Sequence, residues 1–251
     1  MKLARENVHE KDKYISFEEK EHIYTIKGDS SFTSVTTWIH SHFGHFDADA
    51  VIRGIKRKKN YKESKYFNKT DEEIKKEWED NRNSCAEAGT KLHYDIECYY
   101  NDEPQENNSI EYGYFIDFTK KYPDLSAFRT EWMIYDEELK LAGSIDMVYK
   151  NKEDNTYMIY DWKRSKEIKK TSWNKYSKTE CIEHIPDANY WHYALQLNMY
   201  KALLEKNYNI NISELFIVCF HPNHKSYLMY KLPILKDEIE QLLELRKTQI
   251  N

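Results

Sequence analysis

The fold is decided by residues 128–165, which read FRTEWMIYDEELKLAGSIDMVYKNKEDNTYMIYDWKRS. This stretch is rich in aromatic and β-branched residues, and polar clusters interrupt it at residues 136–138 and 151–155. Apolar runs of this composition, separated by residues that favour turns, are typical of consecutive β-strands. The stretch therefore predicts three neighbouring strands joined by two turns.

Helices are expected on both sides of these strands. Upstream, the sequence predicts helices over about 87–100 and 110–121, the second of which Pro123 stops. Downstream, we expect an apolar helix, two strands and a terminal helix over residues 188–208, 214–222, 227–232 and 235–248. This order of elements predicts an α/β sandwich around a mixed sheet.

The N-terminal third has a different character. Residues 13–27 place two aromatic and β-branched runs around the charged stretch EEKE, which predicts a hairpin. The Ser and Thr residues of the stretch 31–37 could cap a helix that begins near Val35. Residues 47–82 are strongly charged and helix-forming, which indicates an exposed helical insertion or arch. We therefore expect residues 1–85 to pack as a hairpin and arch on a core of residues 86–251, within one compact domain.

The bulk composition excludes several classes of protein. A formal net charge of −5 argues against a basic DNA-coating protein, although an enzyme acting on nucleic acid needs only a local positive channel. The N-terminus lacks the apolar segment of a signal peptide, and no apolar run is long enough to span a membrane, so we expect a soluble intracellular protein. The cysteines are too scattered for a zinc ribbon or an iron–sulfur cluster; they are Cys85, Cys98, Cys181 and Cys219.

Two of the predicted strands carry an acid in a position suited to binding a cation. Asp146 and Asp161 are 15 positions apart (161 − 146), a spacing that lets a hairpin bring both to one end of neighbouring strands. Lys163 shares a strand face with Asp161. Paired carboxylates favour a bound cation such as Mg²⁺ or Mn²⁺, and the lysine could orient or deprotonate a water. The alternative is a surface hairpin with an Asp–Lys ion pair.

Two predicted helices add further candidates. Gly89 costs roughly 0.5–1 kcal/mol relative to Ala inside a helix, which suggests that another element approaches its backbone closely. His93, one turn later, could reach a metal ion. Gln196 and Tyr200 share a helix face and could hold a phosphate or the lysine. Taken singly, His93 could equally be a core or surface histidine, and Gln196 with Tyr200 a surface pair.

Together these motifs resemble the PD-(D/E)XK nuclease superfamily in its RecB-like branch. The family patterns G-x-x-x-H, G-x-(I/V)-D, D-x-K and Q-x-x-x-Y match, in order, Gly89–His93, Gly143–Asp146, Asp161–Lys163 and Gln196–Tyr200. The resemblance covers roughly residues 86–220. Within the branch, the stretch Ser34-Val35-Thr36 makes the chain most similar to the mitochondrial genome maintenance exonucleases and their phage and viral relatives.

The resemblance implies a restriction-endonuclease-like core and a metal-dependent DNA nuclease. An exonuclease acting on DNA ends or single strands is favoured, working in recombination, repair or replication and leaving a 5′-phosphate and a 3′-hydroxyl. One or two Mg²⁺ or Mn²⁺ ions would be held by His93, Asp146, Asp161 and the carbonyl of Trp162. Lys163 would position or activate water, and Glu131 would be an auxiliary acid. The substrate would be contacted by Gln196, Tyr200, Ser34, Thr36 and Arg164.

Other functions remain open at this point. One is a structure-specific or RNA-directed endonuclease with the same metal site, and another is a module that binds nucleic acid without cutting it. Two basic stretches could line a nucleic-acid path or simply be solvated. They are Lys56–Lys59 and the lysines of residues 163–178, where Trp173 and Tyr176 are interleaved.

Overall fold

The computed structural model describes residues 1–250 of the chain, and it contains the expected meander. Its strands are β4 (Ser126–Asp136), β5 (Leu141–Lys150) and β6 (Tyr157–Lys163). β4 pairs antiparallel with β5 along almost its whole length, and β5 pairs antiparallel with β6 near its end. The prediction of three consecutive strands is confirmed.

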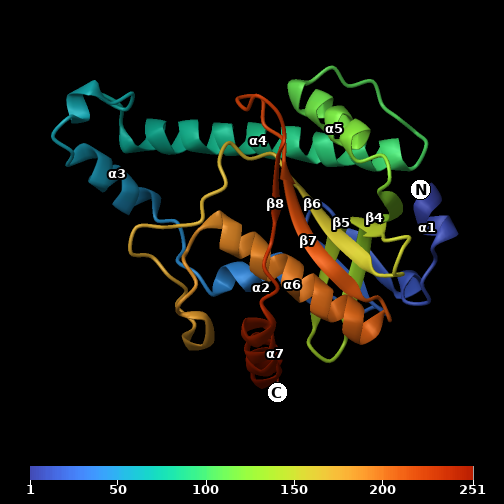
Figure 1. Cartoon of the computed structure of the whole chain (residues 1–251). Helices are drawn as coiled ribbons and strands as arrows, with labels where there is room; N and C mark the ends of the chain where they lie inside the picture. Colours follow the sequence, from blue (N-terminus) through green and yellow to red (C-terminus); the bar gives the residue numbers. More distant parts are fainter. Residues whose placement is uncertain (251) are drawn as a thin grey trace.

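Within these residues the meander forms the centre of a six-stranded mixed sheet. The other strands are β3 (Thr33–Ser34), β7 (Ile212–Cys219) and β8 (Leu228–Lys231). β3 is parallel to β5 and β7 is parallel to β6, whereas β8 is antiparallel to β7. Helices cover both faces of this sheet (Figure 1). This confirms the expected α/β fold, and it is consistent with a restriction-endonuclease-like core.

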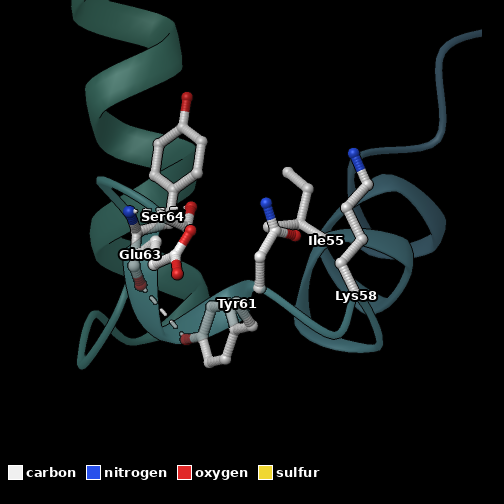
Figure 2. Close-up of a pocket in the computed structure, with 7 residues that line it drawn as sticks. Ile55, Lys58, Tyr61, Glu63 and Ser64 are labelled. Carbon is white, nitrogen blue, oxygen red and sulfur yellow. Dashed lines mark hydrogen bonds between the residues drawn. The ribbon is translucent and has the colours of Figure 1, made fainter.

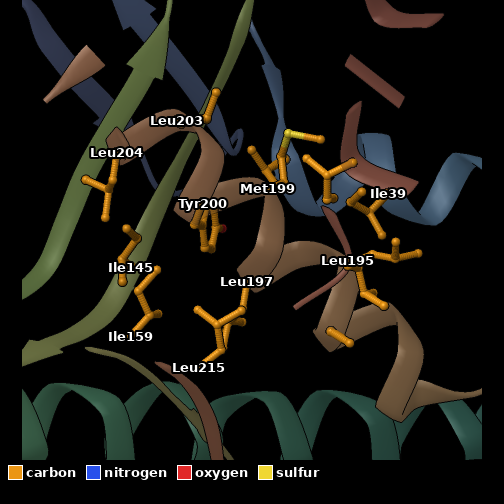
Figure 3. Close-up of a cluster of buried hydrophobic side chains, with 14 of the residues drawn as sticks. Ile39, Ile145, Ile159, Leu195, Leu197, Met199, Tyr200, Leu203, Leu204 and Leu215 are labelled. Atoms are coloured by element: carbon orange, nitrogen blue, oxygen red, sulfur yellow. The ribbon is translucent and has the colours of Figure 1, made fainter. Parts of the chain in front are cut away.

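One face of the sheet is covered mainly by a single apolar helix. The helices on this side are α2 (Val35–Ser41), α6 (Asn189–Asn207) and α7 (Lys236–Ile250). α6 is enclosed between the sheet and the other two helices, which explains why it is apolar on most sides. Figure 3 shows side chains of α6, such as Leu197 and Leu204, beside Ile145 and Ile159 of the sheet.

The opposite face carries an aromatic core under two helices. They are α5 (Ile110–Lys121) and the second half of α4 (Asp71–Tyr100). The large buried rings of this core are Phe115, Phe118, Tyr149, Tyr160 and Trp162. Many of the aromatic residues of the sequence therefore serve packing.

Helix α4 joins two stretches that the sequence indicated as separate helical regions. A capping box starts it, because Thr70 Oγ1 accepts from Glu73 N–H at 3.1 Å while the Glu73 carboxylate accepts from Thr70 N–H at 2.7 Å. The helix expected from about residue 87 is thus continuous with the charged stretch before it, since no Gly or Pro interrupts residues 83–86. The expected boundary between residues 85 and 86 lies inside this helix.

The first half of α4 and its neighbours form the exposed helical region expected over residues 47–82. Between Ile74 and Leu92, α4 buries none of its residues completely. The neighbouring elements are α3 (Ala48–Lys56) and the short helix η2 (Tyr61–Glu63). A pocket of about 300 Å³ lies between these two elements. Figure 2 shows Ile55 and Tyr61 among the residues that line it.

The N-terminal elements pack beside the sheet. They are α1 (Lys2–Glu6), η1 (Asp12–Tyr14) and the hairpin of β1 (Ile15–Glu18) and β2 (Ile23–Ile26), which confirms the predicted hairpin. Tyr24 and Ile26 of the hairpin pack against Tyr135 and Ala142 of the sheet. A further short helix, η3 (Glu180–Ile182), lies in the connection between β6 and α6. Among the described residues, no helix has the length and apolar character needed to cross a membrane.

Candidate active site

The candidate catalytic residues gather where β5 and β6 separate. β4 occupies one edge of β5 over residues 141–150, so β3 and β6 share the other edge. β3 pairs with residues 141–142 of β5 and β6 pairs with residues 147–150. Within residues 1–250, residues 143–146 therefore have no strand partner on this edge. This gap in the sheet coincides with the G-x-I-D motif.

Two side chains form hydrogen bonds with the backbone of Trp162 at the gap. Beyond Tyr160, β6 pairs with β7 but no longer with β5. The backbone N–H of Trp162 donates to Asp146 Oδ2 at 2.7 Å, and the carbonyl of Trp162 accepts from His93 Nε2 at 2.9 Å. A carboxylate from β5 and an imidazole from α4 thus replace the missing strand partner.

The side-chain alternation of β5 is interrupted at Asp146. Ile145 packs in the core under α6, whereas Met147 packs in the aromatic core under α4 and α5. Side chains two residues apart in a regular strand share a face, so these two should not lie on opposite faces. The irregular backbone directs the Asp146 carboxylate into the gap, where it meets the N–H of Trp162.

Glu131 stands opposite Asp146 across the β4–β5 ladder, because the residues on either side of the two are paired. Its backbone φ is 42°, a region that is unfavourable for a residue with a side chain. Ser144 Oγ donates to Glu131 Oε2 at 3.1 Å. This strained conformation and this hydrogen bond together hold the Glu131 carboxylate close to Asp146.

His93, Glu131 and Asp146 form a compact group of side chains that could hold a metal ion, called here the ligand cluster. Nδ1 of His93 lies 3.6 Å from Glu131 Oε1 and 3.6 Å from Asp146 Oδ2. One nitrogen or oxygen from each of the three side chains lies within 4.8 Å of the others. All three are partly buried. One imidazole and two carboxylates are compatible with a divalent metal ion.

The ligand cluster favours a positive charge. Burial alone would lower the pKa of His93, but the nearby carboxylates of Asp146 and Glu131 outweigh burial and raise that pKa to about 9. Burial also raises the pKa of Asp146 above its usual value. Both shifts arise because two acids lie close together with little solvent around them. A bound cation would stabilise the ionised forms of these two carboxylates.

Lys163 and Asp161 form an ion pair beside the ligand cluster. Lys163 Nζ lies 2.5 Å from Asp161 Oδ2, and the Asp161 side chain is only 4% exposed. Burial raises the pKa of Asp161 to about 6. Burial would lower the pKa of Lys163, but Asp161 and Asp146 outweigh it and raise that pKa. The lysine is therefore held as a cation, with its ammonium 5.0 Å from the centre of the Tyr193 ring.

A pocket of about 390 Å³ opens in front of these groups and is called here the site pocket. Its lining includes most of the residues that the sequence indicated: Ser34, Thr36, Glu131, Asp146, Lys163, Gln196 and Tyr200. Asp161 does not line it and lies against Lys163. The structure thus places Glu131, expected as an auxiliary acid, in the ligand cluster and pairs Asp161, expected as a ligand, with the lysine.

Arg164 lies outside the site pocket. Its Nε donates to Glu111 Oε1 of α5 at 2.6 Å, and both side chains are largely buried. Arg164, which we expected to contact substrate, is instead paired with Glu111 of α5 and does not line the site pocket. It anchors the chain where β6 ends.

The two motif glycines differ in what surrounds them. A Cβ on Gly143 would lie 2.6 Å from Cε1 of the Tyr200 ring, so only glycine lets α6 approach β5 this closely. At Gly89 nothing lies within 4 Å of such a Cβ. The expectation of close backbone approach at Gly89 is wrong. Gly89 instead lines a second pocket, of about 500 Å³, which adjoins the first at Glu131 and Phe17.

Several residues of the site pocket were not indicated by the sequence. Phe17, His22 and Tyr24 come from the N-terminal hairpin, and their position depends on how the hairpin packs on the sheet. The signal for Tyr193 was present, because it is three residues before Gln196 and shares its helix face. His40 completes the set from the last turn of α2.

No model of a known protein family matches this sequence, and no curated protein does. Among solved structures, the protein SSO0001 is 13% identical with a TM-score of 0.35, and the match covers 89% of this chain and 78% of that chain. A protein named "Putative exonuclease" from Eubacterium rectale is 9% identical with a TM-score of 0.34, and the match covers 64% of each chain. Likenesses this distant identify no activity, so the function rests on the geometry of the site.

Proposed function

We propose that this chain is a metal-dependent phosphodiesterase that cleaves DNA, acting as an exonuclease on strand ends or single strands. The observation that carries this proposal is the convergence, at one gap in the sheet, of the ligand cluster and a lysine held as a cation. A structural ion pair alone would leave the His93, Glu131 and Asp146 arrangement unexplained.

The ligand cluster would hold Mg²⁺ or Mn²⁺. When bound, such an ion supplies activation of a water and stabilisation of negative charge on the phosphate. Two carboxylate ligands suit both of these hard cations, and the imidazole favours Mn²⁺ of the two. His93 holds its orientation through the hydrogen bond from Nε2 to the carbonyl of Trp162, which leaves Nδ1 facing the two acids.

The remaining polar groups of the site pocket would bind the phosphodiester. Lys163 is held protonated by its acids, so its role is to donate a hydrogen bond and positive charge to the phosphate rather than to take a proton from water. Burial raises the pKa of Tyr200, so its hydroxyl stays a donor. Gln196 Nε2 lies 3.5 Å from this hydroxyl and faces the same pocket.

The activity test uses DNA labelled at either end, single-stranded and double-stranded, with Mg²⁺, Mn²⁺ or EDTA. We expect metal-dependent cleavage by the wild type that leaves a 5′-phosphate and a 3′-hydroxyl, and a loss of about 100-fold or more in Lys163→Ala. Lys206→Ala is the matched control, because Lys206 Nζ lies 2.9 Å from the buried Asp136 in a similar ion pair outside the site pocket.

Three further outcomes separate the alternatives. An exonuclease leaves a circular single strand intact, whereas an endonuclease cuts it. Cleavage of labelled RNA in preference to DNA would favour the RNA-directed alternative. If the wild type binds DNA but cuts neither substrate with either ion, the chain is a binding module and the proposed activity is wrong. The place of the enzyme in recombination, repair or replication is part of the same proposal.

A further inference from the structure

The loop after β6 carries an unusual concentration of positive charge. Its residues 166–178, called here the basic loop, read KEIKKTSWNKYSK and contain five lysines and one acid in a chain whose net charge is −5. Lys169 lies 3.4 Å from Glu167. Within residues 1–250, the other lysines of the loop form no ion pair: Lys166, Lys170, Lys175 and Lys178.

The backbone of the basic loop is anchored at both ends. Near its start, Lys169 N–H donates to Asn189 Oδ1 at 2.7 Å, and the Lys170 carbonyl accepts from Trp191 Nε1 at 2.8 Å. Near its end, Lys178 N–H donates to the carbonyl of His42 at 2.8 Å. The side chains between these anchors are therefore presented from a defined position rather than from a free segment.

Trp173 is at the centre of the basic loop, and 91% of it is exposed. An exposed indole forgoes roughly 1.5–3 kcal/mol of the stabilisation that burial of a large apolar side chain provides. Tyr176, three residues later, is 51% exposed. Exposed rings between unpaired lysines are the features with which proteins bind unpaired nucleic-acid strands, since the rings stack on bases and the ammonium groups contact phosphates.

The basic loop lies next to the site pocket. It begins directly after the strand that carries Lys163, and Asn189 and Trp191, which anchor it, are in the first turn of α6. Tyr193, half a turn further along α6, lines the site pocket and lies under the Lys163 ammonium. Figure 1 shows this connection, in yellow and orange, extending beyond the start of α6.

We propose that the basic loop binds an unpaired DNA strand beside the site pocket, with Trp173 stacked on a base and the unpaired lysines in contact with its phosphates. The charge of the loop, opposite in sign to that of the whole chain, favours a polyanion as the occupant over an apolar protein surface. This inference rests on the proposed function, because it assigns a path to the substrate of that site.

The test measures binding of a fluorescein-labelled (dT)20 oligonucleotide by anisotropy in EDTA, so that no cleavage takes place. We expect Trp173→Ala to weaken binding about tenfold, as loss of one stacked base predicts, while Trp173→Phe keeps most of the affinity. Val8→Ala is the control, because Val8 is 71% exposed and lies outside the loop and the site pocket. Trp173→Ala should weaken the binding of a blunt DNA duplex much less than it weakens the binding of the single strand.

The lysines are tested by the salt dependence of the same binding. Log affinity falls as log salt rises, and replacing Lys166, Lys170 and Lys175 by Gln should make this fall less steep, by about 2 in the slope. The same change at Lys13, Lys152 and Lys236, which lie outside the loop, should leave the slope within about 0.5. Circular dichroism checks that every variant is folded.

Two results would overturn the inference. One is unchanged single-strand affinity in Trp173→Ala, and the other is an equal loss on single-stranded and duplex DNA, which would show that no unpaired base is stacked. The proposed role of the basic loop and the proposed nuclease activity can be rejected separately. A wild type that never cuts DNA rejects the proposed function, whereas cleavage by the wild type with unchanged binding by Trp173→Ala rejects the role of the loop alone.

Discussion

Asp146 of β5 and Trp162 of β6 lie just beyond the point where these strands stop pairing, and Asp146 Oδ2 accepts a 2.7 Å hydrogen bond from the backbone N–H of Trp162. The opening between the strands lets His93 of α4, on one face of the sheet, approach Asp146. Asp146 lines the same pocket as Lys163 and the residues of α6 on the other face. The proposed metal ligand His93 and the proposed phosphate-binding residue Lys163 can meet here because the sheet is split at this point.

Substitution of Asp146 separates its structural role from its role as a ligand. Asp146→Asn keeps a carbonyl oxygen for the Trp162 N–H, so we expect an unfolding free energy within about 1 kcal/mol of the wild type. Asp146→Ala leaves that N–H unpaired and should cost about 1–3 kcal/mol. We expect Mn²⁺ to raise the melting temperature of the wild type, and both variants should lose this rise. A wild-type response to Mn²⁺ in Asp146→Asn would remove Asp146 from the ligand cluster.

The backbone at Glu131 predicts an unusual order of stabilities. Because its φ is 42°, glycine should fit this position better than alanine, by about 1 kcal/mol. We expect Glu131→Gly to be more stable than Glu131→Ala in urea unfolding, although both lose the carboxylate and so bind Mn²⁺ weakly. Equal stabilities would show that the left-handed conformation relaxes when the side chain is removed.

Gly143 should tolerate no side chain. In Gly143→Ala the new Cβ would lie 2.6 Å from the Tyr200 ring, so α6 must shift, and we expect a loss of about 1–3 kcal/mol. Gly54→Ala in α3 is the control, since nothing lies within 4 Å of its Cβ and the helix should gain about 0.5–1 kcal/mol. Unfolding of the two variants in urea measures both changes, and a stable Gly143→Ala would contradict the close contact.

Gly89 should show stability and activity changing in opposite directions. Its Cβ position is open, so Gly89→Ala should stabilise α4 by about 0.5–1 kcal/mol. The added methyl group would enter the pocket beside His93, and we expect slower DNA cleavage, by about tenfold. Urea unfolding and a cleavage assay on the same preparation test this, with Gly54→Ala expected to change stability alone. Full activity in Gly89→Ala would show that substrate does not approach this turn of α4.

His42 should make the stability of the fold depend on pH. Burial lowers its pKa from 6.5 to about 4, so between these values the folded protein binds fewer protons than the unfolded chain. Its contribution to stability is therefore complete above about pH 6.5 and is lost as pH falls toward 4, with a slope of at most about 1.4 kcal/mol per pH unit. Urea unfolding from pH 7.5 to 4.5 should show a shallower fall for His42→Gln than for the wild type. Val8→Ala, a change at an exposed residue that carries no titratable group, should leave the slope as it is.

The order of helices and strands was predictable from the sequence because it depends on local properties. Aromatic and β-branched runs with turn residues between them specified β4, β5 and β6, and the Ser and Thr residues around Val35 marked the start of α2, whose cap is Ser34. The motif spacings likewise indicated His93, Asp146 and Lys163. The continuity of α4 between the helix-forming stretch 47–82 and the helix expected from about residue 87 was missed, although the absence of Gly and Pro from residues 83–86 was a signal for it.

Contacts between distant segments were decided by the tertiary structure alone. Which acid joins His93 depends on the β4–β5 register and on the positive φ of Glu131, and neither leaves a mark on the local sequence. The pairing of Arg164 with Glu111 and the placement of Phe17 at the site pocket follow from packing between elements far apart in the chain. Residue types and spacings thus determined which catalytic and ligating side chains were available. The split between β5 and β6 decided which of these side chains lie in contact, because only the folded sheet brings distant segments of the chain together.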